Sequence, residues 1–354
     1  MALSAALIPA AAQTTQRLTA TKANEYALVY TLPNTILDIT IETERVVKKP
    51  GELYQYANKY LQVNDPVMKP SETVTVKSVT IVPRGVANPD EKYAVKFSSG
   101  NPPFMILDSQ NLPISVNTEK SFTPAAVKLP VPQEAQPTPL ETPAARQAMT
   151  PDMLKSTSVA KRAELAAETI YSLRESRNEI ITGQSEQSFP DGAALQLALD
   201  NINAQEAALT AMFVGTEQRS TNVSTVSYMP DDDITDYVVA RVSSKGVVPA
   251  TDLSGEPIYL SISITDSGEI PVNDKGVELP FPKGGFAYSI PGKAIIRISY
   301  DGKTLAEETK EIAQFGLVYG LAPGLFTDKK APMYMIMDPT TGAVRELGPV
   351  TSEE

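Results

Sequence analysis

Residues 150–183 read TPDMLKSTSVAKRAELAAETIYSLRESRNEIITG, and residues 188–215 read SFPDGAALQLALDNINAQEAALTAMFVG. Both stretches carry small and apolar side chains at helical spacing, and each ends at a glycine, which suits a helix C-terminus. Thr150 is a suitable helix cap, and Pro151 suits a first turn. Because two helices joined by a short loop run antiparallel, the sequence predicts a long α-helical hairpin over residues 150–216.

The chain before this hairpin is typical of strands. Alternation of apolar and polar residues is clearest at Leu37, Ile39 and Ile41. Pro33 predicts a break before this strand, and a slip in the alternation between Val76 and Val79 predicts a bulge in a later strand. A short helix is expected at residues 50–61, where a proline stands in the first turn.

The chain after the hairpin is again typical of strands. Asp301-Gly302 is a strong signal for a two-residue turn between two strands. Alternating methionines indicate a further strand at Met333, Met335 and Met337. The predicted fold class is therefore α+β, with two antiparallel, β-rich, sandwich-like regions and a long antiparallel α-helical hairpin inserted between them.

These patterns divide the chain into segments. The predicted segments are a signal-peptide remnant or disordered N-terminus (1–19), an N-terminal β-rich domain (20–121), a proline-rich linker or surface strap (122–149), the helical hairpin (150–216), a C-terminal β-rich domain (217–350) and a tail (351–354).

The composition excludes several kinds of chemistry. The chain has no His, Cys or Trp, and its formal net charge is −11. Without His or Cys, the usual catalytic triads and zinc sites are excluded. The acidic balance argues against nucleic acid as a partner, because phosphate binding needs a basic face. No cofactor is expected, and no apolar run approaches the ~20 residues that a membrane span needs.

The first residues of the chain indicate export. Residues 2–12 read ALSAALIPAAA, which resembles the apolar part of a secretory signal followed by a cleavage site of small residues. The alternative is a disordered, alanine-rich tail. The signal favours an exported protein that resides in the periplasm, elsewhere in the cell envelope, or outside the cell.

Three stretches of the chain resemble a known family. They are YALVYTLPNTILDITIETERVVKKPGELYQYANKYL (26–61), SLRESRNEIITGQSEQSFPDGAALQLALDNINAQEAALTAMFVGT (172–216) and IAQFGLVYGL (312–321). Together they are similar to a family of uncharacterised Bacteroides proteins that is catalogued as a domain of unknown function. The resemblance implies a Gram-negative envelope location and a signal peptide, and it carries no activity or functional residues.

The densest acidic cluster is Asp231, Asp232 and Asp233. Hard cations such as calcium bind several oxygen ligands on a loop, so this cluster is the one metal candidate. Its spacing differs from that of an EF-hand, and a solvated turn explains it as well. We therefore expect neither a bound metal nor calcium as a partner.

Two groups of residues are candidates for an interaction site. Arg174, Arg177 and Asn178 lie near the end of the first helix, either as a polar recognition spot or as part of a structural ion pair with Glu206 or Asp200. Tyr54 and Tyr56 lie on the short helix, either as an exposed binding platform or packed against a sheet.

These observations favour a non-enzymatic envelope protein, structural or binding, that acts through contact with a protein partner or with itself. Its expected contact surfaces are the helical hairpin and the β domains. The alternatives are a glycan-binding protein and a glycan-active enzyme that uses carboxylates. The enzyme needs a cleft with two carboxylates about 5–10 Å apart, and the binder needs a concave, Tyr-lined pocket.

Overall fold

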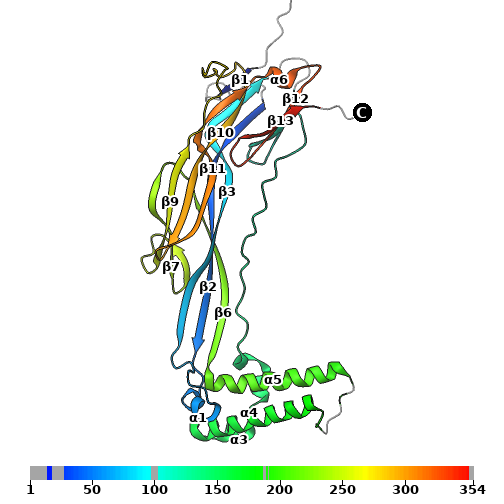
Figure 1. Ribbon diagram of the computed structural model, residues 1–354, viewed down its shortest axis with the longest axis vertical. Coiled ribbons are helices and arrows are strands. Elements are labelled where there is room, and N and C mark those ends of the chain that lie inside the picture. The colour runs from blue at the N-terminus through cyan, green and yellow to red at the C-terminus, as the bar shows by residue number, and fades with distance from the viewer. Residues whose placement is uncertain (1–13, 18–27, 97–102, 186–188, 190, 351–354) are drawn as a thin grey trace, which may run out of the picture.

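The computed structural model describes residues 14–17, 28–96, 103–185, 189 and 191–350. Its described residues form an elongated α+β molecule with three antiparallel sheets, and all the helices except the short α6 lie at one end (Figure 1). The mixed class and the antiparallel sheets were predicted. No helix within the described ranges is both long and apolar enough to cross a membrane.

Sheet A runs the length of the molecule and has the strand order β1-β3-β2-β6. Its strands are β1 (Thr14–Arg17), β2 (Leu28–Lys49), β3 (Ser71–Lys96) and β6 (Thr216–Tyr228). The expected break at Pro33 is wrong: β2 continues through it with a shift in register. The expected bulge is confirmed, because the pairing with β2 passes from Ser78 to Val76 and skips Lys77.

Sheet C faces the middle of sheet A and has the order β11-β10-β9-β7-β8. Its strands are β7 (Ile234–Ser243), β8 (Gly246–Pro249), β9 (Glu256–Asp266), β10 (Phe286–Tyr300) and β11 (Lys303–Leu321). The predicted turn at Asp301-Gly302 joins β10 to β11, and both residues have positive φ, as this tight turn requires.

Sheet B closes the end of the molecule opposite the helices, with the order β13-β12-β5-β4. Its strands are β4 (Met105–Leu107), β5 (Pro113–Val116), β12 (Met333–Met337) and β13 (Val344–Pro349), and the short α6 (Gly324–Thr327) lies beside them. β12 is the strand predicted from the alternating methionines.

Strands from the two β-rich stretches share sheets. β6 pairs with β2 along its whole length, and β12 pairs with β5. Residues 14–17, which fall in the predicted leader, pair with β3 as a strand rather than forming a free tail. The rest of that leader and the tail (351–354) lie outside the described residues, and the division into domains stays a prediction.

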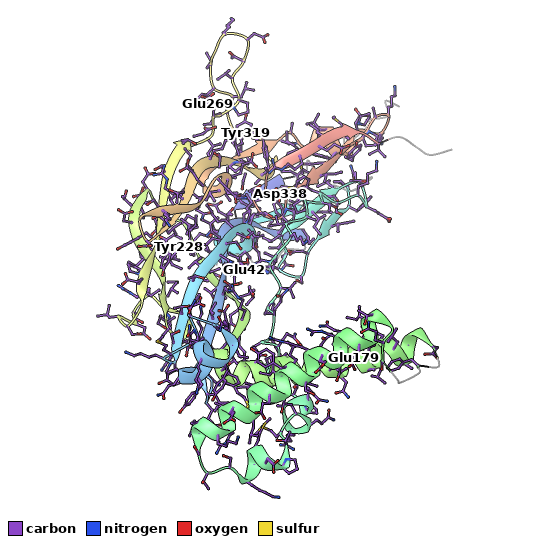
Figure 2. The ribbon with its side chains drawn as sticks, turned by 60° about the horizontal axis from the view of Figure 1, so that its bottom comes forward. Glu42, Glu179, Tyr228, Glu269, Tyr319 and Asp338 are labelled. Carbon is purple, nitrogen blue, oxygen red and sulfur yellow. The ribbon has the colours of Figure 1, made fainter. Side chains whose placement is uncertain are left out.

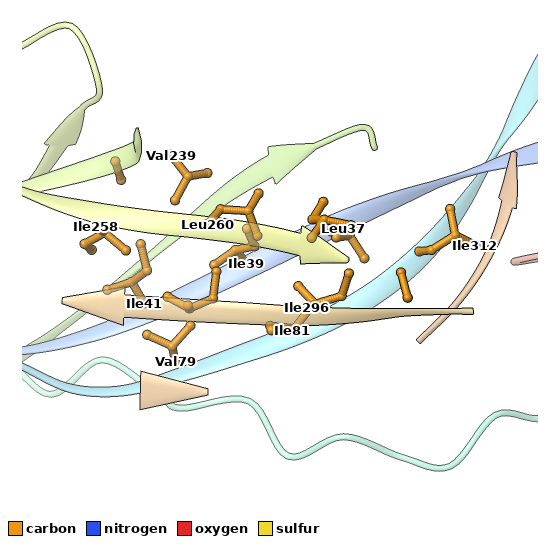
Figure 3. Packing of buried hydrophobic residues seen from close by; sticks show 14 of the residues in the cluster. Leu37, Ile39, Ile41, Val79, Ile81, Val239, Ile258, Leu260, Ile296 and Ile312 are labelled. Atoms are coloured by element: carbon orange, nitrogen blue, oxygen red, sulfur yellow. The ribbon is translucent and has the colours of Figure 1, made fainter. Parts of the chain in front are cut away.

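The main core lies between sheets A and C (Figure 3). Alternate residues of β2 point inward, and Leu37, Ile39 and Ile41 are fully buried there. Leu260 and Ile296 of sheet C meet them from the other side. The apolar residues of the alternating pattern therefore lie on the inner face of a two-sheet sandwich.

A second core joins the upper part of sheet A to sheets B and C. Tyr30 of β2 is fully buried, and its hydroxyl both donates to Ala287 O and accepts from Ala287 N, at 3.0 and 2.8 Å. Burial raises the pKa of Tyr30, so the hydroxyl stays neutral. These two bonds tie β2 to β10 at the point where all three sheets meet.

The helices form the other end of the molecule. They are the 3₁₀ turn η1 (Tyr54–Tyr56), α1 (Ala57–Leu61), the 3₁₀ turn η2 (Pro139–Glu141), α2 (Pro143–Gln147), α3 (Pro151–Lys155), α4 (Val159–Thr182) and α5 (Gly192–Val214). The first predicted helix is therefore two, because the chain is non-helical between Lys155 and Val159. Thr150 caps α3, and Ser158 caps α4.

An extended segment, residues 118–138, connects sheet B to this helical end (Figure 1). We call it the strap. Phe122 lies under the Arg345 guanidinium near its upper end. Gln133 forms an antiparallel bridge with Thr221 of β6 near its lower end. Of the predicted proline-rich segment (122–149), residues up to 138 are extended, whereas residues 139–147 contain η2 and α2.

Candidate functional site

α4 and α5 lie side by side and contact each other, and we call them the helix pair (Figure 1). Arg174 contacts Glu206, and Arg177, one turn later in α4, contacts Asn203, one turn earlier in α5. This reversal is the pattern expected of antiparallel helices. Of the predicted hairpin, the structure thus shows the two helices and the contact between them.

The base of the helix pair is well packed. Its cluster combines α4 and α5 with residues of α1 and α3 and with Ala148, which directly follows α2, and small side chains allow the helices to approach closely. The fully buried members are Leu53, Ala57, Met153, Ala163, Ala166, Ile170 and Phe213. The base is therefore a closed core of its own.

A glycine joins this core to the sheet. A Cβ on Gly51, just after β2, would lie 2.2 Å from Met212 O of α5. Leu53 N donates to the same carbonyl at 2.7 Å. Only a residue without a side chain allows this approach, so Gly51 fixes where the helix pair joins the end of sheet A.

The outer half of the helix pair is open. Among the described residues, α4 has no buried side chain after Ile170, and α5 has none before Ala208. Large apolar side chains are instead exposed, with Ile181 at 65% and Leu197 at 72%. Figure 2 shows this half extending away from the sheets, with Glu179 on it. A layer of two helices leaves faces that no described part of the chain covers.

An ion-pair network marks the boundary between base and outer half. Arg174 Nε donates to Glu206 Oε1 at 2.6 Å, and Arg177 donates to Glu206 Oε2 and, at 3.0 Å, to Asn203 Oδ1. The ion pair considered from the sequence is confirmed with Glu206 as its acid. Asp200 instead accepts a bond from Gln196.

A hollow of about 550 Å³ lies beside this network. Arg174, Arg177 and Glu206 line it together with Thr210 and the start of β6. Two guanidinium groups share one carboxylate here, so the network carries one positive charge in excess. The Glu217 carboxylate, which also borders the hollow, is paired with Lys48 and Arg219. The arrangement suits a small acidic group.

The other predicted interaction residues are placed differently. Asn178 is exposed on α4, and its carbonyl accepts a bond from the Thr182 hydroxyl. Tyr56 packs against the helical base cluster rather than against a sheet, with its ring 6.3 Å from that of Tyr60. Tyr54 is partly buried and accepts a bond from Gln55. The tyrosines therefore form no shared exposed platform.

The acidic cluster acts as part of a turn. Asp232 accepts a bond from the amide of Asp233, and Asp233 accepts one from the amide of Ile264 at 2.5 Å. Across the described ranges, no three acidic side chains gather closely enough to form a metal-binding group. The Asp233 carboxylate thus connects the start of β7 to the neighbouring strand β9.

Sequence reasoning missed a larger hollow of about 750 Å³, between sheet C and β13. Its charged lining comes from distant segments, namely Asp266, Glu269, Lys293, Glu311 and Arg345. Arg345 pairs with Glu311 and, at 2.8 Å, with the buried Asp338. Burial raises the pKa of Tyr288 in the same wall. No local spacing in the sequence reveals this grouping.

The comparison with known protein families found a match for most of the chain. The family model of a domain of unknown function, DUF4831, matches residues 26–345. The chain belongs to this family. No curated protein and no solved structure matches the chain. The description of this family assigns no activity to its members.

Proposed function

We propose that this DUF4831 protein is a non-enzymatic protein of the cell envelope that binds a protein partner through the outer half of its helix pair. The observation that supports this is the contrast within the pair. Its base is closed by three short helices, whereas its outer half exposes large apolar side chains on both helices. Exposed apolar surface on a projecting element is typical of protein-binding sites.

The Arg174–Arg177–Glu206 network supplies a polar contact beside this apolar surface. Both arginines are partly exposed, with side chains 39% and 30% accessible, while Glu206 is 13% accessible. Arginine is enriched where protein interfaces carry most of their binding energy. An acidic side chain of the partner that enters the hollow would meet the excess positive charge.

A photo-crosslinking amino acid at position 197 tests this proposal in living cells. Leu197 is on α5 in the outer half, and its side chain should contact the partner. We expect one discrete adduct in the envelope fraction. An adduct of twice the chain mass would identify the partner as a second copy.

Leu253 provides the matched control, because it is 81% exposed but lies in the loop between β8 and β9. If exposure alone caused capture, crosslinkers at both positions would give the same adducts. Equal labelling at 197 and 253, or none at 197, contradicts a docking site on the helix pair. The variant Leu197→Asp should also lose the adduct of a crosslinker placed at Ile181.

Export is part of the same proposal and needs its own test. The apolar stretch at residues 2–12 supports it. Cell fractionation followed by mass determination of the N-terminus should find the protein in the envelope, cleaved after the alanine run. An uncleaved protein in the cytosolic fraction would contradict export without bearing on the docking surface.

A second candidate is glycan binding at the hollow between sheet C and β13. It is supported by the carboxylates of Asp266 and Glu269 in one hollow with Tyr288, since sugar sites combine acids with aromatic rings. Titration with soluble glycans, followed by NMR, should shift signals of residues in this hollow. The variant Glu269→Gln should weaken the shifts, and an unchanged spectrum at millimolar glycan contradicts this candidate.

A further inference from the structure

The strap and strand β6 lie beside each other with one point of pairing. Gln133 N donates to Thr221 O and Thr221 N donates to Gln133 O, both at 2.9 Å. These mutual bonds define an antiparallel, hydrogen-bonded pair, and such a pair fixes the register of every neighbouring residue. Residues whose numbers add to 354 would face each other if the pairing continued.

β6 has an open edge above this bridge. It pairs with β2 without any shift in register from Thr216 to Tyr228. Since Thr221 points its amide and carbonyl at the strap, Val223, Thr225 and Ser227 point theirs in the same direction. Within the part of the chain that the structure describes, no backbone partner meets these three residues. An unpaired strand edge of this kind readily accepts another extended chain.

The strap above the bridge is extended and unpaired as well. From residue 123 to residue 132 the structure shows no hydrogen bond, and Val127, Leu129 and Val131 are 47%, 48% and 72% exposed. The strap is held at both ends, by Phe122 under Arg345 and by the Gln133 bridge. It lies along the same side of the molecule as β6 (Figure 1).

The positions of the prolines match this register. In a hydrogen-bonded ladder that continues from Gln133, residues 127, 129 and 131 turn their amides toward β6, whereas 128, 130 and 132 turn theirs away. Pro130 and Pro132 are both at positions whose amide faces solvent. Proline is tolerated in a strand at such outward positions of an edge.

Below the bridge, a proline of the strap stands instead at a position whose amide would face β6. Pro137 would face Glu217, at a position where the ladder needs an amide that proline lacks. There the strap leaves β6: the Gln218 side chain, not the backbone, bonds to Gln136 O at 3.1 Å. The prolines therefore permit pairing above the bridge and end it below.

We propose that the edge of β6 from Val223 to Ser227 is a strand-addition site whose occupant is residues 127–132 of the same chain. The strap then becomes a fifth strand of sheet A. Its own prolines face outward, where they prevent a further strand from adding. Val131 pairs with Val223, which places two apolar side chains side by side on the outer face. The bridge at Gln133 already brings the two segments together, which favours the chain's own strap over that of a second copy.

Engineered cysteine pairs test the register, because the chain has no cysteine of its own. Pro130→Cys with Ser224→Cys places two thiols directly opposite each other at a non-hydrogen-bonded position, where disulfides form most easily. The control, Pro130→Cys with Val223→Cys, moves one thiol by a single residue to the other face of the sheet. We expect the first pair to close an intramolecular disulfide about tenfold faster than the control.

Equal rates of disulfide formation in the two cysteine pairs would mean that the strap has no fixed register against β6, and would overturn the proposal. Disulfide-linked dimers in place of closed monomers would assign the edge to a second copy and overturn it as well. Mass analysis under non-reducing conditions distinguishes these outcomes.

Proline substitutions in the strap provide a second test on the full chain, with amide hydrogen exchange as the measurement. Leu129→Pro removes an inward amide, and we expect the Thr225 amide to exchange about tenfold faster than in the unmodified chain. Lys128→Pro, one residue away, removes an outward amide and should leave that rate unchanged. The same rate in both variants overturns the proposal.

Discussion

The sandwich formed by sheets A and C buries its apolar residues more completely than the helix pair does. Between sheets A and C, every strand except β1 contributes side chains to a core that is closed from both sides. In the helix pair, α1, α2 and α3 close the base, whereas no second layer of described residues covers the outer half. The same helices are thus a structural core at one end and a surface at the other. This difference locates the proposed binding site.

Two identical leucine truncations test this contrast and should give its largest effect. Leu260 is fully buried in the sandwich core. Leu260→Ala should lower the free energy of unfolding by about 2–5 kcal/mol, because it leaves a cavity. Leu197→Ala, at the open end of α5, should change it by less than about 0.5 kcal/mol. Urea denaturation measures both, and similar losses would show that the outer half is packed.

A pair of glycine substitutions sharpens the comparison at the two ends of α5. Gly51→Ala forces a methyl group against the Met212 carbonyl and should destabilise the fold by about 1–3 kcal/mol. Gly192→Ala, at the first residue of α5, meets no atom within 4 Å and should be neutral or slightly stabilising. Thermal unfolding distinguishes them. If Gly51→Ala left the thermal stability unchanged, Gly51 and the Met212 carbonyl of α5 would not be in close contact.

The network at the boundary predicts an intermediate effect. Glu206→Gln leaves Arg174 and Arg177 near each other without their shared carboxylate, and should cost about 1–2 kcal/mol. Asp200→Asn, on the same helix, removes an exposed carboxylate and should cost less than about 0.5 kcal/mol. Equal losses in urea denaturation would show that the arginines are solvated rather than held by Glu206.

The sequence was most informative where structure depends on near neighbours. Caps, helical spacing and terminal glycines placed α4 and α5, and the slip between Val76 and Val79 located a real bulge. It was least informative about pairing over long distances. β2 and β3 have 22 and 26 residues and were predicted as several shorter strands, because Pro33 and the polar outer-face residues interrupt the apolar pattern.

The same limit applies to the sites. Glu206 was identified because Arg177 and a second helix on the opposite side imply a carboxylate within reach. The hollow around Arg345 was not, since its charged residues come from β9, the loop after it, β10, β11 and β13, and meet only after the sheets form. No spacing along the chain encodes such a group.

The smallest predicted effect concerns the outer face of sheet A, where Asp38 of β2 accepts bonds from Arg84 Nε at 2.7 Å and Ser227 Oγ at 2.6 Å. The bond from Arg84 lowers the pKa of Asp38 below its ordinary value of 3.8. The carboxylate therefore stabilises the fold above pH ~4, and this contribution is lost as the pH falls through the lowered pKa.

Asp38→Asn should thus lower the free energy of unfolding at pH 7, by no more than about 1 kcal/mol because the Arg84 side chain is half exposed. The difference from the unmodified chain should shrink in urea denaturation at pH 3, and Arg84→Gln should show the same profile. A difference that stays constant from pH 7 to pH 3 would assign the effect to packing. The ion pair across β2 and β3 would then contribute nothing to the stability of the sandwich.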